Sequence, residues 1–161
     1  MLLKRMSLLL ATSLLSVTAM PTATAATARV TDPRGDAAPG ADIVRVTYTN
    51  AHTHVGFRLQ VRDLRPRSEF LLVAGQPRSD WALVAKVKPG RLRWGFQTVT
   101  RTRWIGCRSA TLKWMPRRDV VQVRVPRSCL NRAGFRGSLY MQALSDVRNG
   151  DHAPSRVVRR G

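Results

Sequence analysis

Residues 43–64, IVRVTYTNAHTHVGFRLQVRDL, contain the pattern that decides the fold. In the first part Val44, Val46 and Tyr48 alternate with polar residues, and the alternation resumes at Val55 after the polar run NAHT. A period of two is typical of a β-strand that buries one face. The stretch therefore predicts two strands that pair as an antiparallel hairpin, with its turn at NAHT.

The same period continues through the rest of the chain and is interrupted by turn-forming residues. Residues 69–75, EFLLVAG, are more fully apolar, which predicts a strand in the middle of a sheet. Pro89-Gly90 and the run PRRD at 116–119 each separate two alternating segments and predict two more hairpins. We predict an all-β fold, a single antiparallel β-sandwich of about eight or nine strands, with a closed barrel as the alternative. Residues from 147 onward, VRNGDHAPSRVVRRG, are expected to form its polar C-terminal tail.

The N-terminal region has the layout of a secretory signal peptide. Lys4 and Arg5 precede a leucine-rich apolar run, and two A-x-A sites follow at 23–25 and 26–28. The apolar run is shorter than the ~20 residues that span a bilayer, so an uncleaved anchor is the less favoured alternative. We predict a signal peptide over residues 1–28 with cleavage near 25 or 28. The mature domain, residues 29–161, is then expected to be secreted and to lack a transmembrane segment.

The charge of the chain predicts attraction to polyanions. The formal net charge is +19, and without Lys4 and Arg5 the chain has 26 basic and 9 acidic residues. Such a protein is expected to bind anionic cell-wall polymers, lipid headgroups or extracellular nucleic acid without sequence preference. The alternative is that a GC-rich genome has raised the arginine content. No motif of a sequence-reading nucleic-acid-binding protein is present, so specific nucleic-acid recognition is not expected.

The two cysteines, Cys107 and Cys129, predict one disulfide, because an even number of cysteines in an exported protein favours pairing. Cys107 precedes one strand of the predicted PRRD hairpin and Cys129 follows the other. An antiparallel hairpin brings those two ends together. A catalytic cysteine would need a histidine base that the sequence does not place nearby.

The stretch TDPRGDAAPGADI, residues 31–43, is the strongest candidate for a metal loop. Asp32, Asp36 and Asp42 offer three carboxylates on a backbone rich in glycine and proline, and Asp151 joins them if the tail returns to the first strand. Calcium takes six to eight oxygen ligands, so a structural calcium ion is one interpretation. The other interpretation is that these residues cap turns, as Asp beside Pro and Gly commonly does. No cofactor is required under either interpretation.

Four tryptophans suggest a second kind of candidate site. Trp94 and Trp114 fall on the apolar phase of their strands and are expected in the core. Trp81 and Trp104 lie at strand ends, where exposed rings would provide a stacking platform for a glycan. A glycosidase pair of carboxylates is not expected, because Glu69 is the only glutamate, and no Gly-x-Ser-x-Gly motif is present.

Several stretches together resemble a group of small secreted actinobacterial proteins with no settled activity: DPRGDAAPGADIVRV, FRLQVRDL, VRVPRSCL and DHAPSRVVRRG. This resemblance covers nearly all of the mature chain. The opening loop alone is similar to the start of some carbohydrate-binding and DOMON-like β-sandwich domains, in which acidic residues near this loop hold a structural calcium ion. The fuller acidic run of such loops is interrupted here by Ala37 and Ala38.

These observations predict a non-catalytic secreted protein with a binding or structural role at the cell envelope or outside the cell. Attraction to anionic polymers or surfaces is the expected basis of that role. A carbohydrate-binding module with a structural calcium ion is the first alternative, and a small secreted hydrolase is the second.

Overall fold

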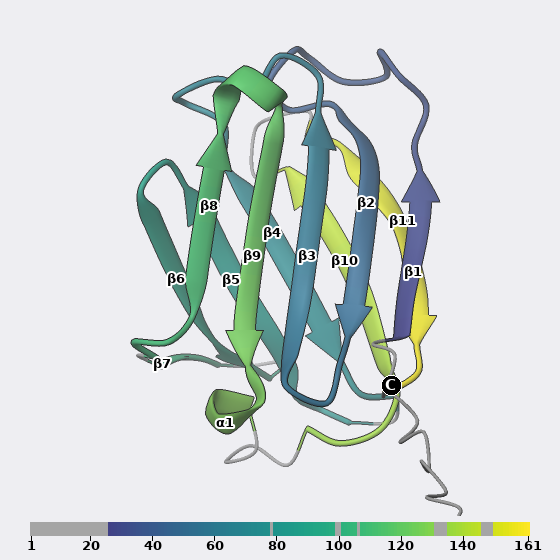
Figure 1. Ribbon diagram of the computed structural model, residues 1–161, viewed down its shortest axis with the longest axis vertical. Coiled ribbons are helices and arrows are strands. Elements are labelled where there is room, and N and C mark those ends of the chain that lie inside the picture. The colour runs from purple at the N-terminus through teal and green to yellow at the C-terminus, as the bar shows by residue number, and fades with distance from the viewer. Residues whose placement is uncertain (1–25, 78, 99–100, 106, 131–134, 146–149) are drawn as a thin grey trace, which may run out of the picture.

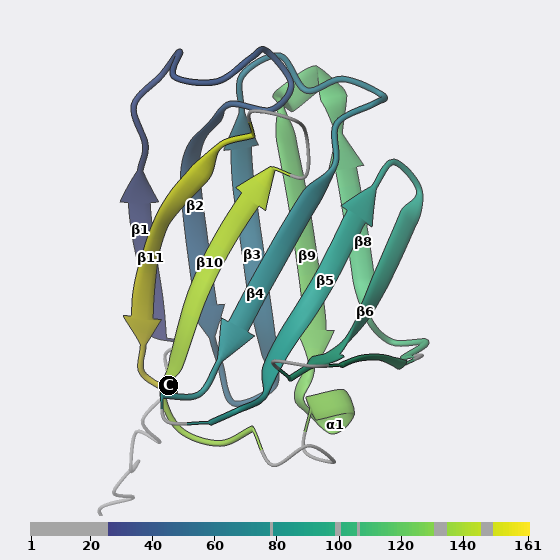
Figure 2. The same ribbon diagram turned by 180° about the vertical axis from the view of Figure 1, so that it is seen from behind.

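The computed structural model describes residues 26–77, 79–98, 101–105, 107–130, 135–145 and 150–161. Two antiparallel sheets pack face to face (Figure 1), which confirms the predicted β-sandwich. The five-stranded sheet has the order β1 (Ala26–Thr31), β2 (Ile43–Asn50), β3 (His54–Val61), β9 (Val120–Pro126) and β8 (Thr111–Met115). The six-stranded sheet, seen from its own side in Figure 2, has the order β11 (His152–Val158), β10 (Leu139–Ser145), β4 (Phe70–Gly75), β5 (Ala82–Lys88), β6 (Arg91–Gln97) and β7 (Thr102–Ile105).

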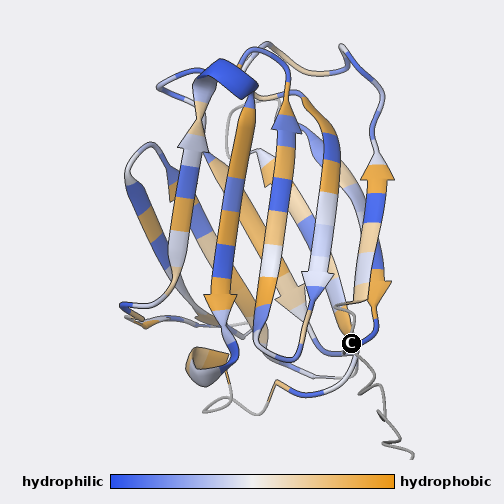
Figure 3. Cartoon of the chain, viewed as in Figure 1, coloured by the Kyte–Doolittle hydropathy of each residue, from blue (hydrophilic) through white to orange (hydrophobic). Residues whose placement is uncertain are grey.

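The core lies between the sheets and is built from every second residue of the strands. Figure 3 shows the resulting bands of hydrophobic and hydrophilic residues along the five-stranded sheet. Tyr48 of β2 and Phe57 of β3 are buried with their rings edge to face at 5.9 Å. Val44 was expected in this core, but it is only half-buried, because a bulge between Ile43 and Arg45 shifts the phase. Ile43 is fully buried instead.

The described residues form eleven strands rather than about eight or nine. Two strands, β6 and β7, lie in the region that follows Pro89-Gly90, and the Arg101 N–H, just before β7, donates to Oγ1 of Thr98, just after β6. Gly95 is needed where β7 comes closest, because a Cβ there would overlap the backbone of Arg103. Two further strands that were not predicted, β1 and β11, lie at the edges of the two sheets.

β11 lies in the segment that was expected to be a polar tail. Pro154 is compatible with this strand, because a proline without an N–H is tolerated on an edge, where β11 lies. The carbonyl of Pro154 accepts a hydrogen bond from the Tyr48 hydroxyl at 3.0 Å. Because β2 and β11 belong to different sheets, this bond ties the two layers together.

The predicted disulfide between Cys107 and Cys129 is present, with the two Cα atoms 6.1 Å apart. Cys129 lies in the short helix α1 (Arg127–Leu130) after β9, and Cys107 precedes β8. The second predicted hairpin joins β8 to β9 through the 3₁₀ turn η1 (Pro116–Arg118), and the Pro89-Gly90 turn joins β5 to β6. Among the described residues, no helix is long and apolar enough to cross a membrane.

A buried arginine closes the end of the sandwich that carries α1. Arg127 is 4% exposed, and its guanidinium donates to the carbonyls of Ala51 and Phe135 and to the Asn50 side chain. Burial, and to a smaller extent the charge of Arg160, lowers the pKa of Arg127. No carboxylate of the described residues pairs with it, and its partners among them are backbone and amide oxygens.

Asn50 completes the same network and is fully buried. Its side-chain amide donates to the carbonyls of Gly137 and Val158, at 3.0 and 2.7 Å. Its own backbone carbonyl accepts from the N–H of Gly161 at 3.0 Å. The C-terminus is therefore fixed at the end of the sandwich where β1 begins, as Figure 1 also shows.

Candidate functional site

Three of the four predicted acidic residues meet at the opposite end of the sandwich. Asp32 follows β1, Asp36 lies in the loop to β2, and Asp151 immediately precedes β11. One carboxylate oxygen from each lies within 4.8 Å of the other two. Asp151 is held in place because its Oδ2 accepts from the Ile43 N–H at 2.5 Å and its own N–H donates to Ser145 at 2.6 Å.

The crowding of these carboxylates changes the acidity of Asp32. Burial is the largest cause, followed by a hydrogen bond with Asp151 and repulsion from neighbouring carboxylates, and together they raise the pKa of Asp32 to about 7. Oδ2 of Asp32 is buried and accepts no hydrogen bond from the described residues. Near neutral pH this carboxyl therefore exchanges between its protonated and charged forms.

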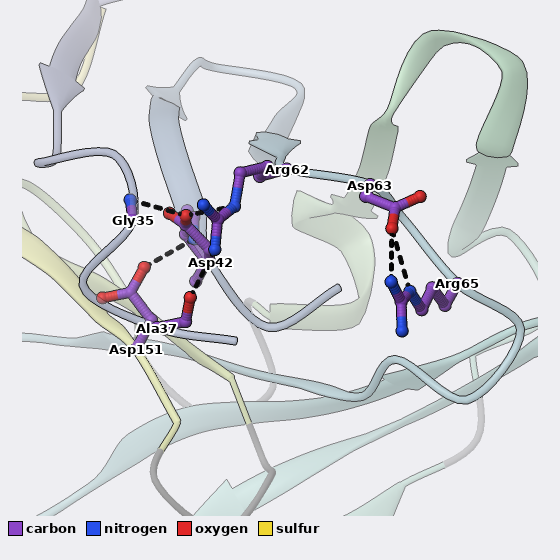
Figure 4. Close-up of polar contacts among 8 residues, drawn as sticks. Gly35, Ala37, Asp42, Arg62, Asp63, Arg65 and Asp151 are labelled. Atoms are coloured by element: carbon purple, nitrogen blue, oxygen red, sulfur yellow. Dashed lines mark hydrogen bonds and ion pairs between the residues drawn. The ribbon is translucent and has the colours of Figure 1, made fainter. Parts of the chain in front are cut away.

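Asp42 lies close by but has a different partner. Its carboxylate is fully buried, and Oδ2 lies 2.8 Å from Nε of Arg62 and accepts from the Gly35 N–H at 2.8 Å (Figure 4). Arg62 also donates to the carbonyl of Ala37 at 2.7 Å. Asp42 thus holds the loop between β1 and β2 against the end of β3, and it stands outside the cluster of three.

The donor set of Asp32, Asp36 and Asp151 has the chemistry of a hard-cation site. Three carboxylate oxygens would supply part of the six to eight ligands of calcium, with carbonyls or water supplying the rest. A divalent cation would also displace the proton that Asp32 retains near neutral pH. An acidic cluster alone does not establish a metal site, so the structural calcium ion stays a prediction.

A hollow on the outer face of the six-stranded sheet contains one of the two predicted glycan residues. Its volume is about 530 Å³, and its lining includes Trp81, Tyr140 and Val157, which are 48%, 40% and 59% exposed. These are three of the four large hydrophobic residues exposed in the described chain. The floor is open because Gly75 and Ala82, neighbours in the sheet, project nothing larger than a methyl group.

The pairing register shows how the hollow is built. Val157, Tyr140, Gly75, Ala82 and Gln97 are successive partners across β11, β10, β4, β5 and β6. Trp81 stands immediately before β5. Neither Tyr140 nor Val157 was predicted from the sequence. Tyr140 lies between Leu139 and Met141, which are buried in β10, so the alternation of this strand places the Tyr140 side chain on the outer face. That alternation was the signal in the sequence that could have identified Tyr140 as an exposed aromatic residue.

Trp104, the other predicted glycan residue, lies elsewhere. It is 37% exposed, and the guanidinium carbon of Arg93 lies 4.8 Å from its ring centroid. It lines a separate hollow with Trp94 and Ile105. A cation–π contact of this kind occupies one face of the indole. Trp94 is buried as expected, and Trp114 is half-buried against Phe70, with ring centroids 6.0 Å apart.

The outer face of the five-stranded sheet is basic. Each of its strands, all described in full, contributes one exposed basic residue, and none contains Asp or Glu. We call this surface the basic face. Its members, in chain order, are Arg29, Arg45, Arg58, Lys113 and Arg124.

Comparison with known proteins adds no functional information. No family model matches the chain, and no curated protein or solved structure gives a significant match. The resemblances to small secreted actinobacterial proteins and to DOMON-like domains therefore stay predictions.

Proposed function

We propose that this chain is an exported, non-catalytic binding domain that attaches to an anionic polymer of the cell envelope through the basic face. The observation that carries the proposal is the single row formed by Arg29, Thr47, Arg58, Gln122 and Lys113. These residues are successive partners across β1, β2, β3, β9 and β8. Their polar side chains point away from the core in every strand.

The spacing of the cations favours a linear polyanion over a small anion. Adjacent strands lie ~4.8 Å apart, so Arg58 stands roughly 10 Å from Arg29 on one side and roughly 10 Å from Lys113 on the other. This separation is close to the Debye length of about 8–10 Å, so their potentials overlap with partial screening. No carboxylate in these strands neutralises them. A flexible chain of phosphate or carboxylate groups lying across the strands would contact all three.

The test is salt-dependent binding of sodium polyphosphate, followed by calorimetry, together with elution from immobilised heparin. The variant Arg29→Gln/Arg58→Gln/Lys113→Gln removes the row. A plot of log K against log salt has a negative slope, and each lost contact reduces the magnitude of that slope by roughly 0.7, as for single-stranded polyanions. We therefore expect the salt dependence to weaken, with the magnitude of the slope reduced by about 2. Elution from heparin should shift to lower salt.

A matched variant separates the row from total charge. Arg91→Gln/Arg117→Gln/Arg118→Gln removes three exposed cations that lie outside the five-stranded sheet. It should retain most of the affinity and most of the salt slope. Equal losses in the two variants would mean that net charge alone attracts polyanions, and the proposed face would then be wrong.

Export is the other half of the proposal, and the position of β1 supports the earlier of the two cleavage sites. β1 pairs with β2 from Ala26 to Thr31. Cleavage after Ala25 leaves this strand whole, whereas cleavage after Ala28 removes half of it. We expect the N-terminal residue of the exported protein to be Ala26. Edman sequencing or intact mass of protein from the culture medium measures it, and retention of residues 1–25 would contradict cleavage.

A further inference from the structure

We propose that the hollow formed by Trp81, Tyr140 and Val157 is a second binding site, which takes a pyranose ring of a neutral polysaccharide. It lies on the outer face of the six-stranded sheet, whereas the basic face covers the five-stranded sheet. The inference is therefore independent of polyanion binding. The two sites would let one small domain hold two chemically different polymers.

The shape of the hollow fits a sugar ring. Gly75 and Ala82 lie between Tyr140 on one side and Gln97 on the other, so at this row of the sheet nothing larger than a methyl group rises from β4 or β5. Two aromatic side chains line this open floor. An aromatic ring presents a negative face, which attracts the weakly positive C–H groups of a pyranose. A volume of about 530 Å³ lies within the range of ligand sites.

The polarity of the hollow favours a neutral ligand. In a chain of net charge +19, Asp80 is the only acidic or basic residue among the described residues that line it. An anionic polymer would gain nothing there, whereas the hydroxyl groups of a neutral sugar can hydrogen-bond to Gln97, Ser79 and Asp80 at the rim. Charge complementarity thus assigns anions to the basic face and neutral glycans to the hollow.

The rings of Trp81 and Tyr140 are large apolar surfaces that remain exposed in the folded domain, at 48% and 40%. Trp104 is a less suitable platform, because Arg93 covers its ring. The inference therefore assigns glycan contact to Trp81 and Tyr140, and leaves Trp104 as a natural control.

The experiment is calorimetric titration of the mature domain with three hexasaccharides in 1 M NaCl. The probes are β-1,4-linked glucose, β-1,4-linked N-acetylglucosamine and α-1,4-linked glucose. High salt suppresses attraction to the basic face. We expect at least one probe to bind, and we expect Trp81→Ala and Tyr140→Ala each to weaken it roughly tenfold or more, the loss that accompanies removal of one stacking ring.

Three controls keep the result interpretable. Trp104→Ala should bind as well as the parent protein. Gly75→Val keeps both rings but fills the floor, where an added Cβ makes only ordinary contacts with Ala82, so this variant should fold and lose binding. The row variant Arg29→Gln/Arg58→Gln/Lys113→Gln should bind sugar normally. The proposal is overturned if no probe binds, if binding survives Trp81→Ala and Tyr140→Ala, or if the row variant abolishes it.

Discussion

The two ends of the sandwich hold their charged groups in opposite ways. At the end that carries α1, the cation of Arg127 is enclosed by carbonyl and amide oxygens, each of which has a donor. At the other end, Asp32, Asp36 and Asp151 crowd together, and burial, followed by the contact with Asp151 and repulsion from the neighbouring carboxylates, raises the pKa of Asp32 to about 7. The first arrangement is complete within the chain, whereas the second changes with pH and with any cation that binds. The first end is thus expected to be rigid and the second responsive.

The largest effect is expected at the Arg127 end. Arg127→Met keeps the apolar stem but leaves the acceptors at Asn50, Ala51 and Phe135 without their donor. An unsatisfied buried acceptor costs about 1–3 kcal/mol, so we expect the free energy of unfolding to fall by about 4 kcal/mol. Urea unfolding measures the change. The control, Arg124→Met, removes an exposed arginine of β9 and should change stability by less than ~0.5 kcal/mol. Similar values for the two variants would contradict the proposed rigidity of this end.

The disulfide at the same end is expected to rank second. It joins residues 22 apart, and on the chain-entropy model such a loop contributes about 3 kcal/mol by restricting the unfolded state. Replacing both Cys107 and Cys129 by Ala should lower the melting temperature, and dithiothreitol should then have no further effect. A reductant-sensitive melt in the double variant would show that the disulfide is not the source of the effect.

Calcium tests the carboxylate end and is expected to act more weakly. With a dissociation constant near 1 mM, as in extracellular modules, 10 mM calcium would stabilise the domain by about 1.4 kcal/mol. Thermal melts in EDTA and then in calcium measure this, with Asp36→Asn/Asp151→Asn as the ligand variant. Asp42 is left intact, because its carboxylate holds Arg62. An unchanged melting temperature in calcium would leave these residues as turn and loop groups.

The smallest effect is a pH dependence that comes from Asp32. Its pKa is raised from 3.8 to about 7 on folding, so the folded protein holds the proton more tightly than the unfolded chain. Stability from this group is fully present below pH 3.8 and is lost as pH rises towards 7. Solvent screens this partly exposed carboxyl, so the loss should be on the order of 1 kcal/mol.

The variant Asp32→Asn isolates that effect, because the amide resembles the protonated carboxyl. Urea unfolding at several pH values should show a flatter profile for the variant between pH 4 and 7, and greater stability than the parent protein at pH 7. A parallel profile in the two proteins would show that another group titrates.

The sequence predicted the central strands well, because there the buried phase and the exposed phase differ strongly. Residues 54–61 alternate cleanly and form β3, and the apolar segment 70–75 lies between β10 and β5 as expected. Prediction failed where another influence competes with alternation. The bulge at Val44 shifts the phase, and Pro154 argues against a strand unless the strand is known to lie on an edge.

The candidate sites could also be predicted only in part from the sequence. The meeting of Asp32, Asp36 and Asp151 was anticipated on the condition that the tail returns to the first strand, and β11 meets that condition. The hollow could not be derived, because Tyr140, Gly75 and Ala82 become neighbours only through the register of three strands. Residue spacing along the chain contains no information about that register.

The place of β11 beside β1 has a consequence for the order of synthesis. The first and last strands belong to different sheets, yet they contact each other along the same side of the sandwich. The growing chain can form the central strands early, but the side of the core beside β1 stays uncovered until β11 has been synthesised. Completion of the fold therefore depends on a strand that is synthesised about 120 residues after β1, and a nascent chain that stops before β11 would expose that side of the core to solvent.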